Sequence, residues 1–484
     1  MAVISPSRAA EPAVDRRSPA ARFAALLDGG TAAPLHHPDD SGVCAARGRI
    51  SGSPVVVYGT DPRRMAGALG VAGAQHITDA IALALRKKCP VIGLWHSGGA
   101  RLADGVASMD GVGRMFAMMT RASGRVPQIS VVLGPAAGAA AYGPALTDIV
   151  IMSDRARLFV TGPDVVRDVT GEQSDMESLG GPQVHGTRSG VAHITTASEA
   201  DAFACARRLV TRLAQPGRVD LAAAAGGEDL RALLPETSRR AYDVRKLVRR
   251  MLDHEAGESA FDELQPRWAA NIVIGLGRLA GRTVGVIANN PLRKCGCLDS
   301  ASAEKAARFV RMCDAFGVPL VVLVDVPGYL PGIGQEWGGV IRRGAKLLHA
   351  FSEATVPRVT LITRKSYGGA YIAMNSRSLG ATAVFAWPEA EVAVMGAAAA
   401  VGVLHRKALA AVTDEAERGE LRARLVAAHQ RSSGGVGRAR ELGVVDAVID
   451  PASTRYRLAQ ALLTARGGQR WRGSRQGRHG NIPL

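Results

Sequence analysis

The sequence predicts an α/β protein in which one domain occurs twice. Short apolar strands alternate along the chain with segments of helical periodicity, and glycine-rich turns follow the strands. This alternation is typical of sheets whose faces are covered by helices. The 484 residues are too many for one ordinary domain, and no Gly/Ser-rich or Pro-rich linker divides them. We therefore expect two closely packed domains.

Each repeat unit consists of a strand, a glycine-rich turn, a helix and a second strand. The strands of the first unit are expected at 90–95 and 127–133, with a helix at about 109–123 between them. In this helix the apolar residues at helical spacing are Val112, Met115, Phe116 and Met119. The second unit repeats the order strand, helix, strand over 319–324, about 340–351, and 357–362.

The spacing of four prolines supports a duplication. Pro90 and Pro127 are 37 residues apart, and Pro319 and Pro357 are 38 residues apart. The equivalent prolines of the two units are separated by 229 and 230 residues. A chance likeness of two strand–helix units is not expected to preserve both spacings, so a duplicated domain is favoured.

The domains are expected to divide near residues 230–245. At the start of the first domain, Ser18 and Pro19 suit the N-cap and first position of a helix that buries Phe23 and Leu26. The predicted organisation is a disordered segment at 1–17, an N-terminal domain at 18–235, a C-terminal domain at 236–470 and a basic, extended tail at 471–484.

The net charge of +17 comes from 60 Lys and Arg residues against 43 Asp and Glu residues. A basic surface can bind nucleic acid or a small polyanion, but it can also reflect an arginine-rich proteome. Aromatic residues make up only 4% of the chain, and no zinc-finger spacing or RNA-binding aromatic pattern occurs. A nucleic-acid partner is therefore not expected.

The cysteines and the hydropathy pattern indicate a cytoplasmic protein without a metal site. Of six cysteines, only Cys295 and Cys297 lie close together, and a lone C-x-C lacks the second pair that a structural zinc site needs. We expect reduced thiols and no metal. The N-terminus has no apolar signal core, and the most apolar stretch, 131–146, is broken by prolines and a glycine. No membrane association is expected.

Three glycine turns are the candidate binding sites: Ser97–Ala100, Ala137–Ala140 and Gly368–Ala370. Each follows an apolar strand and precedes a helix-like segment, where successive backbone N–H groups lack partners and the helix dipole is positive. Such a turn can hold the oxyanion of a thioester enolate. The alternative is that small residues merely let a helix pack tightly on a strand. For a single turn the packing interpretation is favoured, and equivalent turns in both halves make the two interpretations about equally supported.

Side-chain catalysts are harder to find. The chain has no G-x-S-x-G elbow and no H-E-x-x-H pair, and these turns lack the spacing of a P-loop or a G-x-G-x-x-G motif. Ser97 and Ser189 have no evident partner His and Asp, while His185 and His193 flank Ser189 and Gly190 and are interpreted as structural hydrogen-bonding residues. A site built from backbone N–H groups suits chemistry in which a cofactor supplies the base.

Longer segments around these turns resemble the carboxyltransferase β-subunit family of actinobacterial acetyl-/propionyl-CoA carboxylases. The resemblance runs from about residue 18 to the end of the sequence, and its motifs are specific in combination. They are HSGGARLADGV (96–106), ASGRVPQISVVLGPAAGAAAYGPALTD (122–148), FVTGPDVV (159–166), LGGPQVHGTRSGVAH (179–193), VDVPGYLPG (324–332), RRGAKLLHAF (342–351), RKSYGGAYIAMNSR (364–377) and FAWPEAEVAVMG (385–396).

The resemblance implies two tandem crotonase-like domains, each a ββα superhelix, and a homohexamer arranged as a trimer of dimers. Active sites are then expected at the dimer interface, where the N-terminal half of one subunit faces the C-terminal half of its partner. The first half is expected to hold the nucleotide portion of acyl-CoA, and biotin is expected to enter mainly against the second half.

Carried over by position, the N–H groups of Gly369 and Ala370 hold the enolate oxygen of the acyl thioester. Those of Gly138 and Ala139 hold the ureido oxygen of biotin. The resemblance implies that carboxybiotin releases CO2, that the ureido nitrogen removes the α-proton, and that the enolate attacks CO2. The substrate-binding residues implied are Gly98, Gly99, Ala100, Tyr142, Tyr371 and Ile372.

Two residues depart from the family pattern. Ala139 stands where the family commonly has a second glycine, and alanine fits only if this position has ordinary backbone angles. Ile372 stands in the acyl pocket where propionyl-preferring members often have Asp. We therefore expect use of acetyl-CoA or of both acetyl- and propionyl-CoA, since one methylene is worth only ~1–3 kcal/mol.

The chain has no biotin-attachment Met-Lys-Met and no ATP-grasp segment. Biotin is therefore expected on a partner, a biotinylated α subunit that combines biotin carboxylase and biotin carrier. Three alternatives stay open at this point: a crotonase-type hydratase or thioester hydrolase, a biotin-dependent acyl-CoA decarboxylase subunit, and a non-catalytic scaffold in which Ala139 has disabled one site.

Overall fold

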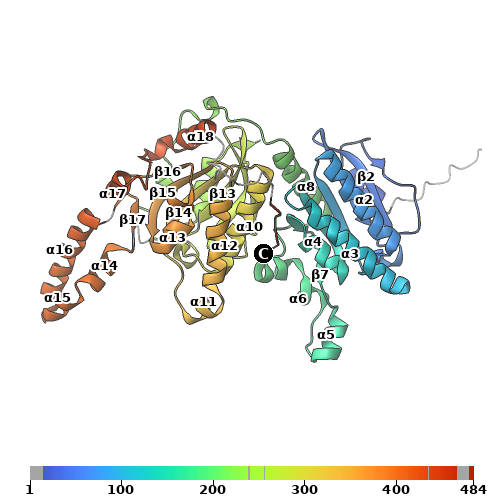
Figure 1. Cartoon of the computed structure of the whole chain (residues 1–484), viewed down its shortest axis with the longest axis horizontal. Helices are drawn as coiled ribbons and strands as arrows, with labels where there is room; N and C mark the ends of the chain where they lie inside the picture. Colours follow the sequence, from blue (N-terminus) through green and yellow to red (C-terminus); the bar gives the residue numbers. More distant parts are fainter. Residues whose placement is uncertain (1–14, 238–239, 256, 434, 466–478, 484) are drawn as a thin grey trace, which may run out of the picture.

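The computed structural model describes residues 15–237, 240–255, 257–433, 435–465 and 479–483. Two sheets of eight strands, one from each half of the chain, stand side by side with helices over their faces (Figure 1). The expected disordered segment 1–17 lies mostly outside the described residues, as does most of the expected tail.

The first sheet has the strand order β1-β2-β3-β4-β5-β6-β8, and β7 pairs with β5. The pairs β1–β2 and β2–β3 are antiparallel, and all later pairs are parallel. Its strands are β1 (Ala33–Pro34), β2 (Val43–Ile50), β3 (Ser53–Thr60), β4 (Val91–Ser97), β5 (Gln128–Ala137), β6 (Ile149–Met152), β7 (Arg157–Phe159) and β8 (Ile194–Thr195).

The second sheet repeats this topology as β11-β12-β13-β14-β15-β16-β18, with β17 on β15. A short hairpin, β9 (His254–Glu255) with β10 (Glu258–Ser259), precedes it. Its strands are β11 (Asp262–Leu264), β12 (Ile272–Leu279), β13 (Arg282–Asn289), β14 (Leu320–Val326), β15 (Arg358–Tyr367), β16 (Ala383–Ala386), β17 (Glu391–Ala393) and β18 (Ala447–Val448). The predicted duplication is confirmed in strand order and direction.

The helices of the two halves also correspond. The helices of the first half are α1 (Pro19–Leu26), α2 (Val71–Lys87), α3 (Gly105–Ala122), α4 (Ala139–Ala145), α5 (Pro163–Thr170), α6 (Met176–Gly180), α7 (Pro182–Val184) and α8 (Glu199–Ala214). Those of the second half are α9 (Val244–Met251), α10 (Ser300–Phe316), α11 (Ile333–Trp337), α12 (Val340–Glu353), α13 (Gly368–Ala373), α14 (Ala397–Leu404), α15 (Arg406–Ala411), α16 (Glu415–Ser433), α17 (Val436–Glu441) and α18 (Thr454–Thr464). In this series α2, α3, α4 and α8 match α10, α12, α13 and α18.

Local signals in the sequence set several helix boundaries. Ser18 caps α1 by accepting a hydrogen bond from the Ala21 N–H, with Pro19 as the first helical residue. The predicted helix at 109–123 is α3, which begins earlier, at Gly105. The four predicted strands are all present, and β5 and β15 continue past their predicted ends as far as the glycine turns.

The strands are buried on both faces, as expected for parallel sheets. In β3, Val55 and Val57 face the core under α1 and α8, while Val56 and Tyr58 face the core under α2 and α3. The first of these cores continues into the second half and takes in residues of β12, β14 and α10. The two halves therefore share one hydrophobic core.

Packing places the division between the halves earlier than the predicted position between 235 and 236. Leu230 and Tyr242 are buried in the core under α9 and α18. Ala224 packs with Ala280 and Ala459, which also belong to the second half. The chain therefore joins the second half soon after α8 ends at Ala214.

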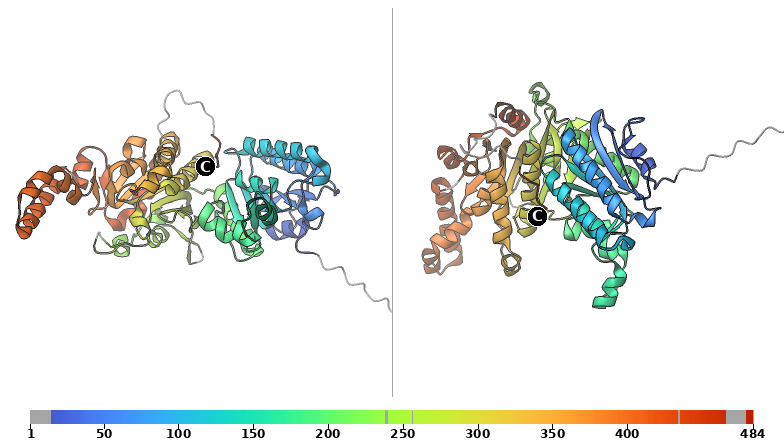
Figure 2. Two further views of the ribbon diagram at one scale, coloured as in Figure 1. Left: turned by 90° about the horizontal axis from the view of Figure 1, so that it is seen from below. Right: turned by 45° about the vertical axis from the view of Figure 1, so that its right-hand side comes forward.

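Residues 479–483 lie between the two halves of their own chain, where the C-terminus is marked in Figures 1 and 2. Asn481 donates from its backbone N–H to Ser123 Oγ (2.9 Å) and from its side chain to Asp148 Oδ1 (2.8 Å), both in the first half. From α10 of the second half, Arg311 donates to the Gly480 carbonyl (3.1 Å). This part of the tail bridges the halves.

Among the described residues, no helix is both long and apolar enough to cross a bilayer. All six cysteines are free thiols. Cys89, Cys205 and Cys313 are buried, while Cys295 is exposed.

Asp148 gives the bridge between the halves a pH dependence. Burial raises the pKa of its carboxyl group from 3.8 to about 6, although hydrogen bonds from Asn481 and Gln128 oppose the shift. The folded state therefore binds this proton more tightly than the unfolded state. The stability that protonated Asp148 contributes is present below pH 4 and is lost as the pH rises through 6.

Replacing Asp148 by Asn removes this dependence. Relative to the wild type, Asp148→Asn should gain stability as the pH rises from 4 to 7, by up to ~3 kcal/mol for a shift of about two pKa units. Chemical unfolding of both proteins across this range measures the difference, with Asp168→Asn, an exposed carboxyl, as control. Parallel pH profiles for wild type and Asp148→Asn would contradict the assignment.

Candidate active site

Two turns at equivalent places carry the candidate site. β5 ends at Ala137 and β15 ends at Tyr367, and in each half one glycine with positive φ leads into a short helix. Gly138 has φ 56° and Gly368 has φ 59°. The structural repeat therefore matches Gly138 with Gly368, and Ala139 with Gly369.

The N–H groups at the start of α4 and α13 point out of the helices without a helical acceptor. In an α-helix the first N–H groups have no carbonyl one turn back to bond to, and no side chain caps either helix. In the second half these groups belong to Gly369 and Ala370, the two residues predicted from the sequence. In the first half they belong to Ala139 and Ala140.

The predicted pair Gly138 and Ala139 is therefore shifted by one residue. The Gly138 N–H donates to the Phe159 carbonyl oxygen (3.1 Å), which lies at the end of β7. It is not free to hold a substrate oxygen, because β7 pairs with β5 and takes up this donor. The structure offers Ala139 and Ala140 in its place.

Alanine fits at position 139. Ala139 is not among the described residues with positive φ, since the left-handed conformation is taken by Gly138 before it. A Cβ atom at the equivalent Gly369 would meet no atom within 4 Å and would point into open space. Ala139 therefore keeps its N–H in place, and the main reason for regarding the chain as a non-catalytic scaffold disappears.

The N–H groups of Gly98 and Gly99 are not free to bind a ligand, and their turn supports the adjacent end of β5. The Gly98 N–H donates to the Ala66 carbonyl (2.9 Å), and the Gly99 N–H donates to Ser97 Oγ (3.2 Å). A Cβ atom at Gly99 would lie 2.9 Å from the Ala137 carbonyl oxygen, so this turn packs directly against the end of β5. The third residue of the predicted set, Ala100, forms a bridge with Leu69.

The predicted side chains of the site line two separate surfaces. Tyr142 on α4 is half exposed and meets Phe116 of α3 edge to face, with ring centroids 6.5 Å apart. On α13, Tyr371 is half-buried, and burial raises the pKa of its hydroxyl. Ile372 follows it with 42% of its surface exposed. One chain therefore presents each half of the predicted site in a different half of the molecule (Figure 1).

A buried ion pair, absent from the sequence prediction, supports the second turn. Arg364 Nε donates to Asp325 Oδ2 (2.7 Å), and both side chains are almost fully buried. The guanidinium group also lies over the Tyr242 ring, 4.6 Å from its centroid. The pair ties β14 to β15 directly before Gly368, and a buried charge left without its partner is costly.

In the first half, a histidine packed over a glycine occupies the place that this ion pair has in the second half. His96 stands in β4 where Asp325 stands in β14, and Gly134 stands in β5 where Arg364 stands in β15. A Cβ atom at Gly134 would lie 2.5 Å from the His96 ring, so the glycine makes room for the imidazole. Burial, with smaller effects from Arg22 and Arg17, lowers the pKa of His96 to about 4. It is neutral at physiological pH.

The histidines near Ser189 have structural partners. His193 Nδ1 accepts from the Val150 N–H (3.1 Å), as its interpretation as a structural residue requires. His185 Nδ1 lies 2.7 Å from Ser189 Oγ and its Nε2 lies 2.6 Å from the Leu158 carbonyl oxygen. The third partner is a carbonyl and not a carboxylate, so the group differs from a Ser-His-Asp triad.

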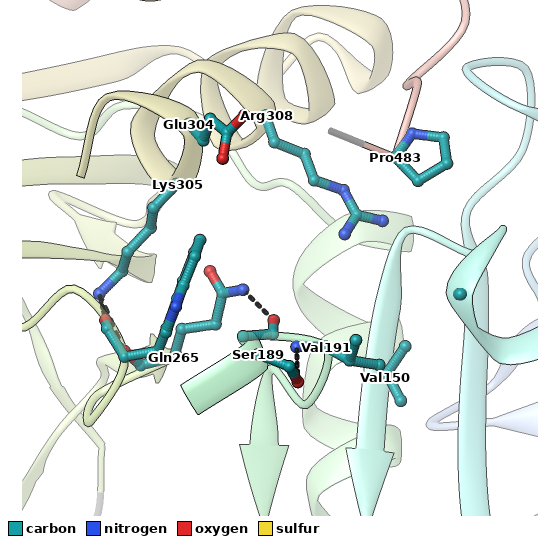
Figure 3. A pocket seen from close by; sticks show the side chains of 11 residues that line it. Val150, Ser189, Val191, Gln265, Glu304, Lys305, Arg308 and Pro483 are labelled. Carbon is teal, nitrogen blue, oxygen red and sulfur yellow. Dashed lines mark hydrogen bonds between the residues drawn. The ribbon is translucent and has the colours of Figure 1, made fainter. Parts of the chain in front are cut away.

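A cavity of about 210 Å³ lies at the junction of the halves and is not part of this site (Figure 3). Its lining includes Ser189 and Val191 from the first half, Gln265 and Arg308 from the second, and Pro483. Beside it, Lys305 Nζ donates to the carbonyl oxygens of Gln265, Trp268 and Ile272, each at 2.8 Å. Lys305 thus fixes the loop between β11 and β12.

Comparison with known proteins identifies the family. A model described as the carboxyl transferase domain matches residues 14–479. The biotin-dependent acetyl-/propionyl-coenzyme A carboxylase beta6 subunit of Mycobacterium tuberculosis is 59% identical over 485 residues, which cover 100% of both chains. The propionyl-CoA carboxylase beta chain of Rhodococcus erythropolis is 62% identical over 439 residues, covering 90% of this chain and 92% of that protein.

A solved structure of transcarboxylase 12S, described as a hexamer assembly with methylmalonyl-coenzyme A and methylmalonic acid bound, has the same fold. Its TM-score is 0.88 at 38% sequence identity, and the match covers 96% of this chain and 91% of that one. The likeness confirms the duplicated crotonase-like architecture expected from the sequence. The chain therefore belongs to the carboxyl transferase family of biotin-dependent acyl-CoA carboxylase β subunits.

Proposed function

We propose that the protein transfers a carboxyl group from carboxybiotin, carried by a biotinylated α subunit in the cytoplasm, to acetyl-CoA and propionyl-CoA. The products are malonyl-CoA and methylmalonyl-CoA. The observation that carries the proposal is the pair of equivalent helix starts, at α4 and α13, whose first N–H groups have neither a helical acceptor nor a side-chain cap. Two oxyanions, one on each reactant, need two such sets of donors.

Each set of donors has one oxygen to hold. The N–H groups of Gly369 and Ala370 are assigned to the enolate oxygen of the thioester, and those of Ala139 and Ala140 to the ureido oxygen of biotin. Because the donors are fixed by helix geometry, they need not reorganise as negative charge develops. Biotin would supply the carboxyl group and, through its ureido nitrogen, the base that removes the α-proton.

The side chains beside the turns disfavour a hydratase, which needs a free acid or base there. Of the acidic residues on the strands next to β15, Asp325 in β14 is paired with Arg364, and Glu391 in β17 accepts a hydrogen bond from the Tyr367 hydroxyl group. Hydration of crotonyl-CoA without biotin is the reaction that distinguishes this alternative. Decarboxylation would use the same donors, and only the partner and the direction of transfer separate it from carboxylation.

The acyl group is expected to meet Ile372. This side chain is exposed on α13, three residues after Gly369, and offers an apolar surface to a short acyl chain. An apolar wall of this kind discriminates weakly between acetyl and propionyl groups, since one methylene is worth ~1–3 kcal/mol. This supports the use of both substrates.

A complete site requires two subunits in this proposal, because the two sets of donors belong to different halves of one chain. We propose a homohexamer arranged as a trimer of dimers. Support comes from large apolar side chains that the single chain leaves exposed on α11 and at the start of α12. They are Ile333 (68% exposed), Trp337 (87%) and Ile341 (78%).

The central prediction is an assay. The purified protein, its biotinylated partner, ATP and bicarbonate should convert acetyl-CoA and propionyl-CoA into acid-stable carboxylated products, with butyryl-CoA as a third chain length. No carboxylated product from any of the three would refute the proposal. Efficient hydration of crotonyl-CoA in the absence of biotin would favour the hydratase instead.

Adjacent glycines in the second turn give a matched pair of variants. Gly368→Ala should cost about 1–2 kcal/mol, because alanine is strained at positive φ and its Cβ would lie 3.1 Å from the Val394 carbonyl oxygen. Gly369→Ala should leave stability unchanged, because Ala139 already occupies the equivalent place. Thermal unfolding of both variants tests this, and equal losses would contradict the matching of the turns.

A larger side chain at position 369 should separate activity from folding. Gly369→Val should lower carboxyl transfer at least about 100-fold, the usual effect of losing one oxyanion donor, because a branched side chain would occupy the open space beside this residue. Gly402→Val, at a glycine with open space in α14, is the control. Retained activity in Gly369→Val with an intact oligomer would refute the assigned donors.

The subunit contact can be tested at Trp337. Trp337→Glu should reduce the mass measured by light scattering while leaving the circular dichroism spectrum unchanged, because a buried charge opposes association but an exposed one does not disturb the subunit. Leu463→Glu on α18, another exposed apolar residue, is the control. An unchanged mass for Trp337→Glu would show that this surface lies outside the interface.

A further inference from the structure

Three side chains with metal-binding atoms lie together in the first half of the chain. His36 and Asp39 belong to the loop between β1 and β2, and His76 lies on α2. Their ligating atoms are all within 4.8 Å of one another. Only the fold brings the loop and the helix together, so no short motif in the sequence marks the cluster.

His36 presents a nitrogen lone pair that has no partner. Its Nδ1 lies 2.9 Å from the His37 carbonyl oxygen. Because a carbonyl oxygen can only accept, Nδ1 carries the proton and Nε2 carries the lone pair. Nε2 is buried and has no hydrogen-bond partner among the described residues. Metal-binding histidines are held in this way, with one ring nitrogen donating to a carbonyl and the other bound to the metal.

Asp39 and His76 supply the other two atoms. His76 Nε2 lies 2.6 Å from Asp39 Oδ2, with one proton between them. An ion bound here would displace this proton to His76 Nδ1 or to solvent. The other carboxylate oxygen of Asp39 accepts from the Ser41 N–H (3.0 Å), which orients the group. Arg64 is engaged with the neighbouring Asp40 at 2.6 Å, so the Asp39 carboxylate is not neutralised by that guanidinium group.

The imidazole rings of His36 and His76 are stacked, with centroids 3.5 Å apart and planes 2° from parallel. A tetrahedral ion with bonds of about 2.0–2.1 Å needs donors about 3.3–3.4 Å apart. Binding therefore requires the stack to open, which the solvent-accessible side chains of His76 and Asp39 permit.

We propose that His36, Asp39 and His76 bind one divalent transition-metal ion, with water completing the coordination. Two imidazole nitrogens and a carboxylate oxygen match the ligands that Zn²⁺ takes in proteins. They do not match the all-oxygen sets that Ca²⁺ and Mg²⁺ prefer. From the sequence we expected no metal, because the cysteines lack the spacing of a zinc site. This cluster contains no cysteine.

The ion would fasten the loop at residues 35–41 to α2. Arg101, which directly follows the Gly98–Gly99 turn, donates to the Ser41 carbonyl oxygen in this loop (2.9 Å). The fastened loop thus borders the turn that packs against the end of β5. The ion has a structural role in this proposal, and the site stands whether or not the carboxyl transfer proposed above is correct.

Calorimetric titration of the chelator-treated full-length protein with Zn²⁺ tests the site. One ion should bind per chain with a Kd of about 1 μM or tighter, equivalent to ~8 kcal/mol. His36→Asn, Asp39→Asn and His76→Asn should each weaken binding at least about tenfold. His37→Asn is the matched control, because it removes an adjacent exposed imidazole and keeps the carbonyl that orients His36.

Two further measurements distinguish a specific metal site from non-specific binding at the surface. Co²⁺ should give the visible absorption of a low-coordinate nitrogen and oxygen site in the wild type and in His37→Asn, but not in His76→Asn. Zn²⁺ should raise the unfolding midpoint of the same two proteins only. No stoichiometric binding by the wild type, equal weakening by His37→Asn, or unchanged binding in the three cluster variants would each overturn the proposal.

Discussion

The architecture depends on one backbone constraint. Directly after β5 and directly after β15, one residue must adopt the left-handed backbone conformation, with positive φ. Gly138 and Gly368 meet it with nearly the same φ. This residue turns the chain from a strand in the middle of the sheet into a helix that starts at the carboxyl end of that strand, so the first helical N–H groups lie at the turn without a helical acceptor. The neighbouring strands are arranged around it, since β7 takes up the Gly138 N–H and the Gly98–Gly99 turn packs against Ala137.

The two halves keep this turn while supporting it by different means. An ion pair between Asp325 and Arg364 joins the strands in the second half, and a neutral His96 packed over Gly134 fills the same place in the first. The two arrangements cannot be mixed. An arginine at position 134 would collide with the His96 imidazole, and a glycine at position 364 would leave the buried Asp325 carboxylate without its arginine partner. The halves can therefore diverge in charge without changing the backbone that presents the N–H groups.

The fold was largely predictable because apolar periodicity and the spacing of prolines report directly on strands and their repetition. The donor set was predictable only in part. Gly369 and Ala370 do lie at a helix start, and their role as oxyanion donors stays a prediction. The sequence could not show that the Gly138 N–H is taken by the Phe159 carbonyl oxygen, because that bond depends on how β7 pairs with β5. The Asp325–Arg364 pair and the cluster of His36, Asp39 and His76 are contacts between distant segments, and neither has a local signature in the sequence.

The position of residues 479–483 has a consequence for the order of events during synthesis. Asn481 contacts Ser123 and Asp148, which leave the ribosome long before it, and Arg311 holds the carbonyl of Gly480. The halves can already join through the core that α8 shares with β12, β14 and α10, but Asp148 lacks the hydrogen bond from Asn481 until this segment arrives. The two halves can therefore pack together first, and residues 479–483 then add a second, polar connection between Ser123, Asp148 and Arg311.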